Sequence, residues 1–444
     1  MSERAINALS FFERHKDFAA DYVKNGIETN RKGYCRVVVK DKDGKRVPGA
    51  KVTAVQKTHD FKFGCNIFML DEFENEEKNA IYRGEFAKHF NYATVPFYWS
   101  DLEPAYGKPR YEIGSPKVYR RPSPDLCVQY CKENGIRMKG HCLAYDTSCF
   151  SPDYLPDDDR AARKLYDKHF KEISERYADD IDDWDITNEL LCPDVIRADK
   201  PNIIKAYDYL EWVYDIGKKY FPYNTRLINE AAELGDRDFK GNRTPYYMLV
   251  ERMIGNGAPV NAVSMQAHSF VRREAEKDFS AYRYNPVYIA AQMKLYSDFR
   301  LPLQISEVTL PAYSLDAEDE RVQAALVRNM YSMWFASPLM EGIVYWNLVD
   351  GYAAFAPQGT LEGENYYCGG LIRYDMSKKP ALEALDDLIA SWHTEETVET
   401  NADGEAVFKG FYGNYDVKVT SAAGEKAAEI HVDKYYERPK VVNL

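Results

Sequence analysis

Basic residues are too scarce in this sequence for a partner that carries many phosphates. The 444 residues include 58 Lys and Arg against 70 Asp and Glu, which leaves a formal net charge of −12. Nucleic-acid binding needs a basic surface that neutralises the phosphates. We therefore expect no nucleic-acid partner, and the composition leaves an uncharged or cationic ligand open.

Long apolar runs are also missing near the start of the chain. Residues 1–33 are polar and charged, with Phe11-Phe12 as the only pair of bulky apolar neighbours in their first half. Such a segment lacks the apolar centre of a signal peptide and cannot span a membrane. We expect no membrane partner. We also expect a cytoplasmic protein, or a secreted one if a leader has been removed.

Metal-ligand patterns are absent as well. The eight cysteines include no Cys-x-x-Cys pair and form no zinc-like cluster with the eight histidines. We therefore expect free thiols in a reducing compartment, and neither a metal nor a cofactor. A metal-dependent barrel hydrolase or isomerase stays as an alternative, and it would need ligands at several strand ends, for example His141, Asp146 and His268. It is disfavoured because only two histidines stand at strand ends and no His-x-His pair occurs.

Apolar runs alternate with amphipathic stretches through the middle of the chain, and the 45% hydrophobic content is enough for a large core. Residues 162–177, for example, place apolar side chains three and four positions apart, as in a helix that packs on a sheet. Eight apolar runs occur in order, at 61–68, 92–98, 136–143, 181–188, 226–230, 261–268, 303–309 and 342–349. The alternation predicts an α/β fold, a closed (β/α)8 TIM barrel over 61–393. A doubly wound open sheet is the alternative, but no Gly-rich phosphate turn follows the first run.

Both ends of the chain carry short alternating patterns around turn dipeptides. Residues 34–60 place two such runs around Asp43-Gly44, and residues 394–444 repeat the pattern. Each set is typical of β-hairpins, which are marginal alone but stable when packed together. We predict a small β-sandwich built from both segments, with residues 1–33 as a helical segment leading into it.

This predicted sandwich has few clustered aromatic residues that could bind sugar. The exceptions are Phe411-Tyr412 and Tyr435-Tyr436. We therefore expect a structural role that closes the termini, with a carbohydrate-binding module as the alternative.

Two glutamates stand at the ends of predicted barrel strands. Glu189 closes the stretch Trp184-Asp185-Ile186-Thr187-Asn188-Glu189, and Glu307 lies in the run at 303–309. The C-terminal ends of barrel strands face one shared cleft. Hydrolysis of an acetal needs an acid that protonates the leaving oxygen and a carboxylate that meets the oxocarbenium-like carbon. Either glutamate alone could simply cap the following helix, but the pair is the layout of a glycosidase.

Other polar and aromatic residues end further runs of the barrel. Among these, His268 is placed to orient Glu307, and Trp346 to form an apolar floor for a sugar ring. Asn188, next to Glu189, can donate to a sugar hydroxyl near the reacting carbon. The candidate set at the barrel mouth is His141, Asn188, Gln266, His268 and Trp346, with the two glutamates.

The chain resembles glycoside hydrolase family ten, whose founding activity is endo-β-1,4-xylanase, over roughly residues 58–393. The stretches that carry the resemblance are Phe61-Lys62-Phe63-Gly64, Phe90-Asn91 with Trp99 and Glu103-Pro104, Gly140-His141, Trp184 to Glu189, Gln266-Ala267-His268, Ile305-Ser306-Glu307, Trp346, Gly370-Leu371-Ile372 and Lys379-Pro380-Ala381. Each is weak alone, but their order and spacing are specific. The terminal strands also resemble the β-module of plant-type members.

The resemblance implies a retaining glycoside hydrolase that cleaves β-linked oligosaccharides or polysaccharides of xylan type by double displacement. Glu189 would be the acid/base and Glu307 the nucleophile. The residues implied to bind substrate are Asn188, His141, Tyr145, Gln266, His268, Trp346 and Trp99. The alternatives are a β-glycosidase for a non-xylan or decorated β-glycoside and a non-catalytic carbohydrate-binding barrel. The second is disfavoured because it need not keep both glutamates.

The sequence departs from the family pattern in residues that bind the sugar. The family carries a Glu-Asn pair and a Lys after the second strand, which hold the xylose units on the non-reducing side, and residues 92–99 contain none of these. Tyr145 replaces a Trp, and Ala354 or Phe355 replaces the second Trp that covers the sugar. We therefore predict weak activity on plain xylan and better activity on short or decorated oligosaccharides or on another β-glycoside.

Overall fold

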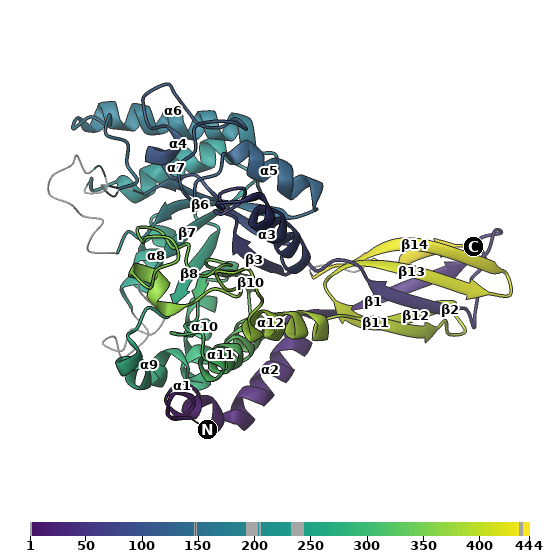
Figure 1. Cartoon of the computed structure of the whole chain (residues 1–444). Helices are drawn as coiled ribbons and strands as arrows, with labels where there is room; N and C mark the ends of the chain where they lie inside the picture. The colour runs from purple at the N-terminus through teal and green to yellow at the C-terminus, as the bar shows by residue number, and fades with distance from the viewer. Residues whose placement is uncertain are drawn as a thin grey trace.

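The computed structural model describes residues 2–145, 147, 149–191, 203, 206–231, 244–434 and 438–444. At its centre lies a closed barrel of parallel strands, in which β10 closes against β3 (Figure 1). The barrel strands are β3 (Lys62–Asn66), β4 (Tyr92–Pro96), β5 (Arg137–Ala144), β6 (Asp183–Asn188), β7 (Thr225–Glu230), β8 (Ala262–His268), β9 (Leu303–Thr309) and β10 (Met340–Tyr345). Each overlaps a predicted run, which confirms the (β/α)8 barrel.

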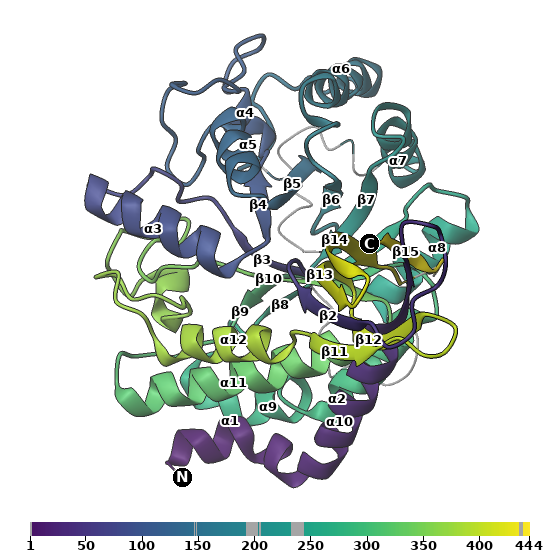
Figure 2. The ribbon, with the colours of Figure 1, turned by 90° about the vertical axis from the view of Figure 1, so that its right-hand side faces the viewer.

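Helices cover the outside of the barrel (Figure 2). They are α3 (Glu76–His89), α4 (Trp99–Leu102), α5 (Pro124–Glu133), α6 (Asp159–Tyr177), α7 (Tyr209–Tyr220), α8 (Pro245–Gly255), α9 (Glu276–Arg283), α10 (Pro286–Ser297), α11 (Ala317–Ala336) and α12 (Pro380–Ser391), with 3-10 turns η3 (Arg273–Ala275) and η4 (Gly363–Tyr367). In α6, Asp158 caps the backbone N–H of Ala161, and the residues at helical spacing, such as Tyr166, Phe170 and Ile173, are buried. Within the described ranges, no helix is long and apolar enough to cross a membrane.

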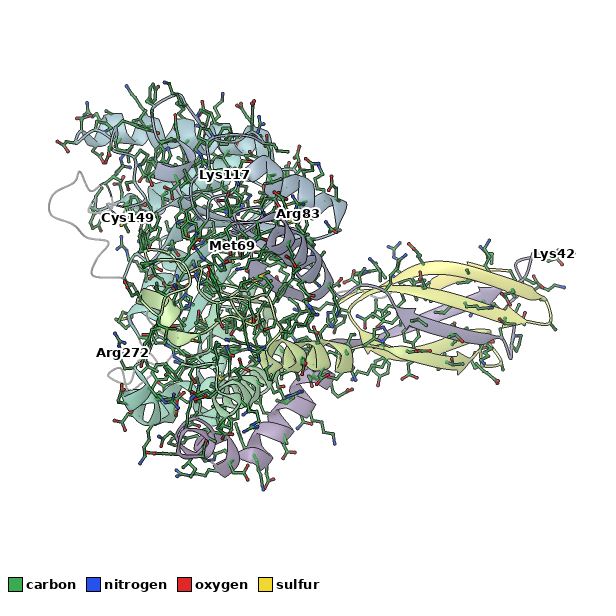
Figure 3. The ribbon with its side chains drawn as sticks, in the orientation of Figure 1. Lys42, Met69, Arg83, Lys117, Cys149 and Arg272 are labelled. Carbon is green, nitrogen blue, oxygen red and sulfur yellow. The ribbon has the colours of Figure 1, made fainter. Side chains whose placement is uncertain are left out.

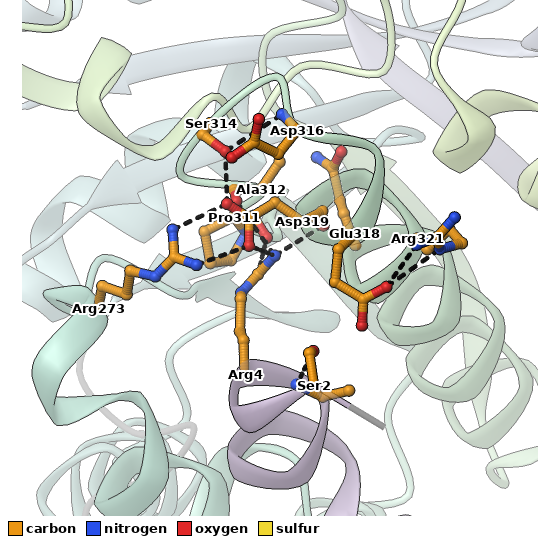
Figure 4. A network of polar contacts seen from close by, with 12 residues as sticks. Ser2, Arg4, Arg273, Pro311, Ala312, Ser314, Asp316, Glu318, Asp319 and Arg321 are labelled. Atoms are coloured by element: carbon orange, nitrogen blue, oxygen red, sulfur yellow. Dashed lines mark hydrogen bonds and ion pairs between the residues drawn. The ribbon is translucent and has the colours of Figure 1, made fainter.

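Two helices, rather than the single one suggested by the sequence, precede the barrel. They are α1 (Glu3–Arg14) and α2 (Lys16–Asn30), and both pack against α11. The buried Arg4 donates to the carbonyls of Pro311 and Ala312 and pairs with Glu276 and Asp319 at 3.3 and 3.2 Å (Figure 4). This network ties α1 to the loop that follows β9.

The terminal segments form two small sheets that face each other. One contains β1 (Lys32–Lys40), β12 (Glu405–Phe411) and β15 (Lys440–Asn443). The other contains β2 (Lys51–Gln56), β11 (Glu395–Glu399), β13 (Gly413–Ser421) and β14 (Gly424–Val432). The alternating side chains of both sheets meet in a core of their own, separate from that of the barrel.

The hairpin expected within residues 34–60 is wrong, because β1 and β2 lie in different sheets. β1 pairs with β12 and β15, whereas β2 pairs with β11 and β13. The reason is burial: Val37 of β1 and Val52 of β2 both point into the shared core, from opposite sides. Alternating sequence patterns are the same for two paired strands and for two strands that face each other. Tyr435 and Tyr436 lie outside the described residues.

The sandwich and the mouth of the barrel lie on opposite sides of the molecule. Lys42 marks the tip of the sandwich, whereas Cys149 and Arg272, in the loops that follow β5 and β8, lie on the far side of the barrel (Figure 3). At the junction, the rings of Phe335 and Trp392 stack at 3.9 Å, and Phe411 of β12 packs beside them. The sandwich therefore attaches at the end of the barrel where the strands begin.

Candidate active site

A pocket of about 390 Å³ opens at the C-terminal ends of the barrel strands. Every predicted site residue except Trp99 lines it. These are His141, Tyr145, Asn188, Glu189, Gln266, His268, Glu307 and Trp346. Ala354 and Phe355, from the segment that departs from the family pattern, also reach the wall. The pocket thus gathers residues from β5, β6, β8, β9 and β10 and their following loops.

An irregularity in β6 aims Asn188 and Glu189 at the pocket. Against β7, Asp185 pairs with Leu227 and Thr187 with Ile228, so β6 holds one extra residue there. The extra residue changes the alternation of inward and outward side chains. Thr187 then contacts Tyr214 of α7 outside the barrel, and Asn188 points inward. Glu189 follows with φ of 52°, in the left-handed region, and its N–H donates to the carbonyl of Asn229 at 3.0 Å.

A second irregularity does the same for Glu307 in β9. Met265 pairs with Ile305 and the next residue, Gln266, pairs with Glu307, so Ser306 is the extra residue. Ser306 and Glu307 consequently both point into the barrel although they are neighbours in a strand. Strict alternation would have turned Glu307 outward.

Asn229, at the end of β7, connects the two strands that carry the glutamates. Its Nδ2 donates to Asn188 Oδ1 at 2.8 Å and to Glu307 Oε1 at 2.9 Å, and its Oδ1 accepts from the Ser306 hydroxyl. Asn229 is not among the site residues predicted from the sequence. The signal was present, because Asn229 precedes Glu230 at the end of the fifth apolar run in the same way that Asn188 precedes Glu189 at the end of the fourth.

Glu189 is held by two neutral donors. Gln266 Nε2 donates to its Oε1 at 2.9 Å, and the Tyr145 hydroxyl donates to its Oε2. Burial, followed by the negative charge of Glu189, raises the pKa of Tyr145, so the phenol stays protonated and remains a donor. The tyrosine found in place of the family's tryptophan thus contacts the carboxylate that is implied to be the acid/base.

Glu307 is held by His268 and Asn229. Burial lowers the pKa of His268 to about 4, so its imidazole is neutral near pH 7. In this form Nε2 can donate to Glu307 Oε2, 3.0 Å away, while Nδ1 accepts from Thr309 Oγ1 at 2.9 Å. The structure therefore places His268 within hydrogen-bond distance of Glu307.

Burial away from water is the main influence on the pKa of Glu307. Burial raises its pKa to about 7, and the charge of Glu189 adds to this effect, while His141 and Lys139 oppose it. His141 Nδ1 lies 2.8 Å from Asp185 Oδ2, and Lys139 Nζ lies 2.9 Å from the same oxygen. Lys139, His141 and Asp185 therefore form a buried group of polar and charged side chains beneath the pocket.

Aromatic rings build one wall of the pocket. Trp346 packs edge-on against Phe68 at 5.2 Å and against His141 at 5.7 Å. Phe150 stacks on Tyr145 at 4.8 Å and lies 4.5 Å from the ring of Tyr98. Flat apolar surfaces beside polar groups suit a sugar ring, which has apolar C–H faces and polar edges.

Trp99 is the predicted binding residue that the structure does not bring to the pocket. Its ring stacks on His169 of α6 at 4.0 Å, and its Nε1 donates to Glu103 Oε2 at 3.2 Å. These contacts give Trp99 a packing role between α4 and α6, so we do not include it in the substrate-binding set below.

One example ligand of the metal-dependent alternative, Asp146, lies outside the described residues. Among the residues that are described, no group of three or more His, Cys, Asp or Glu side chains is placed to hold a metal ion. His141 is instead engaged with Asp185, and His268 with Glu307 and Thr309.

The structure is similar to the solved structures of a GH10 protein and of a xylanase. The GH10 protein of Paenibacillus barcinonensis aligns over 75% of this chain and 96% of its own, with a TM-score of 0.57 and 18% identity. Native xylanase 10B of Thermotoga maritima aligns over 75% of this chain and 95% of its own, with a TM-score of 0.57 and 15% identity. At such identities the likeness establishes the shared fold.

Two curated sequences are similar to this chain over most of its length. Endo-1,4-beta-xylanase 2 of Arabidopsis thaliana is 19% identical over 436 residues, which are 97% of this chain and 36% of that protein. Anti-sigma-I factor RsgI6 of Acetivibrio thermocellus is 23% identical over 410 residues, 90% of this chain and 46% of that protein. The chain thus spans less than half the length of these relatives. The sequence model of glycosyl hydrolase family 10 matches residues 56–387, which include all eight barrel strands, and the chain belongs to this family.

Proposed function

We propose that this chain is a retaining glycoside hydrolase that cleaves β-glycosidic bonds of xylan-type or related oligosaccharides. One observation carries the proposal: Glu189 and Glu307, from different strands, face one pocket, and each is held by its own pair of donors. Two carboxyls across one bond are what double displacement at an acetal requires.

In the first step, Glu189 gives its proton to the glycosidic oxygen while the Glu307 carboxylate attacks the anomeric carbon. The bond between carbon and leaving oxygen breaks, and a covalent glycosyl-Glu307 ester forms. In the second step, Glu189, now a carboxylate, takes a proton from water as that water attacks the anomeric carbon. The ester bond breaks, Glu307 leaves as a carboxylate, and the product keeps the original configuration.

The donors around each glutamate support these roles. His268 and Asn229 approach Glu307 through different oxygens and fix the plane of its carboxyl group. Asn229 also fixes Asn188, whose amide can then donate to a sugar hydroxyl next to the reacting carbon. Such hydrogen bonds strengthen as positive charge develops on the ring.

Weak binding of plain xylan is part of the proposal. The wall that follows β4 presents the ring of Tyr98, and Phe355, which is 82% exposed, stands at the rim near Phe150. Neither residue offers the carboxylate, amide and ammonium groups that hold xylose hydroxyls in the family pattern. A site built around substrate hydroxyls discriminates strongly, so their loss should redirect the choice of sugar.

A panel of linear xylo-oligosaccharides, decorated oligosaccharides and aryl β-glycosides tests this proposal, with products detected by mass. We expect turnover by the wild type and none by Glu307→Gln, which keeps the shape of the side chain but cannot attack. Binding without turnover by the wild type would instead support a non-catalytic carbohydrate-binding barrel. A kcat/KM of about 10⁴–10⁸ M⁻¹s⁻¹ on linear xylo-oligosaccharides, above that on decorated ones, would contradict the substrate preference alone.

A further inference from the structure

Two neighbouring arginines, Arg120 and Arg121, belong to the wall of the pocket. They come from the long loop between α4 and α5, and they are 2% and 8% exposed. Arginine is rarely buried so deeply unless its charge has a partner. Neither residue has a part in the double displacement, so their place beside the reacting groups needs another explanation.

Arg121 keeps part of its guanidinium available to a ligand. The group lies 3.9 Å above the ring of Tyr98, and its Nε pairs with Asp101 Oδ2 at 2.9 Å. Nη1 donates to the carbonyl of Arg120 at 3.0 Å. Over the described ranges, no hydrogen bond from Nη2 is found. The contacts with Tyr98, Asp101 and Arg120 therefore fix the orientation of the Arg121 guanidinium. Its outer nitrogen, Nη2, can still donate hydrogen bonds to a ligand.

Arg120, next to Arg121 in the chain, is held by hydrogen bonds to two other residues. Nη1 donates to the carbonyl of Tyr352, and Nη2 donates to Asn347 Oδ1 at 2.6 Å. Its Nε is buried without a hydrogen-bond partner in the described part of the chain. The backbone of Arg120 has φ of 61°, in the left-handed region. Strained backbone of this kind persists where surrounding contacts over-determine it, often at functional sites.

The two positive charges act on each other in the absence of substrate. Burial lowers the pKa of Arg120, and the charge of Arg121 lowers it further. Glu364 lines the same pocket and attracts Arg120, but burial raises the pKa of Glu364 and weakens its hold as a counter-charge. An anion placed against the pair would relieve this repulsion, and the planar fork of arginine matches a carboxylate with two parallel hydrogen bonds.

We propose that Arg121, backed by Arg120, binds the carboxylate of an acidic sugar, a hexuronic acid whose ring lies on Trp346. Phe68 connects the two features, since its ring contacts Trp346 at 5.2 Å and the Arg121 guanidinium lies 5.5 Å from its centre. The inference rests on the proposed function, because it names the sugar that the hydrolase would take. An acidic sugar also differs from the uncharged or cationic ligand expected from the composition. The net charge of −12 is a property of the whole chain, whereas the pocket wall at Arg120 and Arg121 is positively charged.

Three aryl glycosides with one leaving group test the proposal: 4-nitrophenyl β-D-glucuronide, β-D-glucoside and β-D-xyloside. They differ only in the group on C5, which is a carboxylate, a hydroxymethyl group or a hydrogen atom. We expect the wild type to prefer the glucuronide by 10-fold or more in kcat/KM. Arg121→Gln should lower kcat/KM on the glucuronide by about 10- to 100-fold, the range for a hydrogen bond to a charged group, and leave the xyloside within threefold.

Lys117→Gln is the matched control, because Lys117 is an exposed cation of the same loop that binds the carbonyl of Asp71 and does not line the pocket. It removes the same charge and should leave all three rates unchanged. A wild-type preference for a neutral glycoside, or an equal loss on all three substrates in Arg121→Gln, would overturn the carboxylate subsite. If no glycoside is hydrolysed, the proposed function fails by itself. Calorimetry with free glucuronate and glucose then decides, because the subsite requires tighter binding of glucuronate and its loss in Arg121→Gln.

Discussion

Glu307 has lost its contact with water, and this sets the pH range in which the pocket can react. Its pKa lies near 7, whereas attack on the anomeric carbon requires the carboxylate. We therefore predict that kcat/KM falls as the pH decreases through about 7, because protonated Glu307 cannot attack. A pH–rate profile on an aryl β-glycoside measures this acid limb as a property of the free enzyme. An acid limb near 4.5, the ordinary value for glutamate, would show that the site stabilises the carboxylate far better than its burial suggests.

Tyr145 gives a second prediction at the residue scale. Its hydroxyl donates to Glu189 Oε2, so Tyr145→Phe leaves that oxygen without the donor which aims it. We expect kcat/KM to fall about 10-fold on substrates with poor leaving groups, where protonation limits the rate. Aryl glycosides with good leaving groups need little acid help and should change less than twofold. Equal losses on both kinds of substrate would assign Tyr145 to sugar binding instead.

Several site residues could be found from the sequence because they end strands. Glu189 follows an apolar run of recognisable length, and Gln266 and Glu307 lie near the ends of two others, and parallel barrel strands bring these ends together. Arg121 gave no such signal, since it lies in a long loop whose course the apolar pattern does not determine. The sequence did not predict the extra residue at Ser306 either, because such an irregularity depends on how a strand pairs with the neighbouring strand.

At the scale of elements, the pairing of β5 with β6 leaves no room for a side chain at Gly140. A Cβ added there would lie 2.2 Å from the ring of Trp184 in the neighbouring strand β6. We predict that Gly140→Ala lowers the free energy of unfolding by about 1–3 kcal/mol, the usual effect of overpacking. Chemical denaturation followed by tryptophan fluorescence measures the change.

Gly84 is the matched control for this substitution. It lies within α3, and a Cβ there would meet nothing within 4 Å. Gly84→Ala should stabilise the protein by about 0.5–1 kcal/mol, since alanine loses less backbone entropy in a helix. If both substitutions had the same effect, the contact between Gly140 and Trp184 would not constrain the barrel.

At the scale of the whole molecule, the sandwich depends on both ends of the chain. Removal of residues 395–444 would take Phe408 and Val417 from the core they share with Val37 and Val52. We predict a lower melting temperature or lower solubility, because the remaining β1 and β2 would expose apolar faces and unpaired edges. Thermal unfolding of the full and shortened chains makes the comparison.

Activity measurements on the shortened protein distinguish a structural role of the sandwich from a role in carbohydrate binding. The sandwich lies on the far side of the barrel from the pocket, so kcat/KM of the folded shortened protein on short aryl glycosides should stay unchanged (Figure 3). A shortened protein that is fully stable and loses affinity only for polymer would favour a binding module. Sequence patterns indicated strands at both ends of the chain but wrongly paired those within residues 34–60, because facing and paired strands alternate in the same way.

Double displacement requires that Glu307 attacks the anomeric carbon while Glu189 transfers the proton. Proton NMR of the product during the first minutes of hydrolysis, before the anomers equilibrate, tests this most directly. We predict that the β-glycoside gives the β-anomer first, because two displacements restore the configuration, with the two carboxyls about 5–5.5 Å apart. Initial appearance of the α-anomer would mean that water attacks in a single displacement, and it would contradict the role of Glu307 as nucleophile.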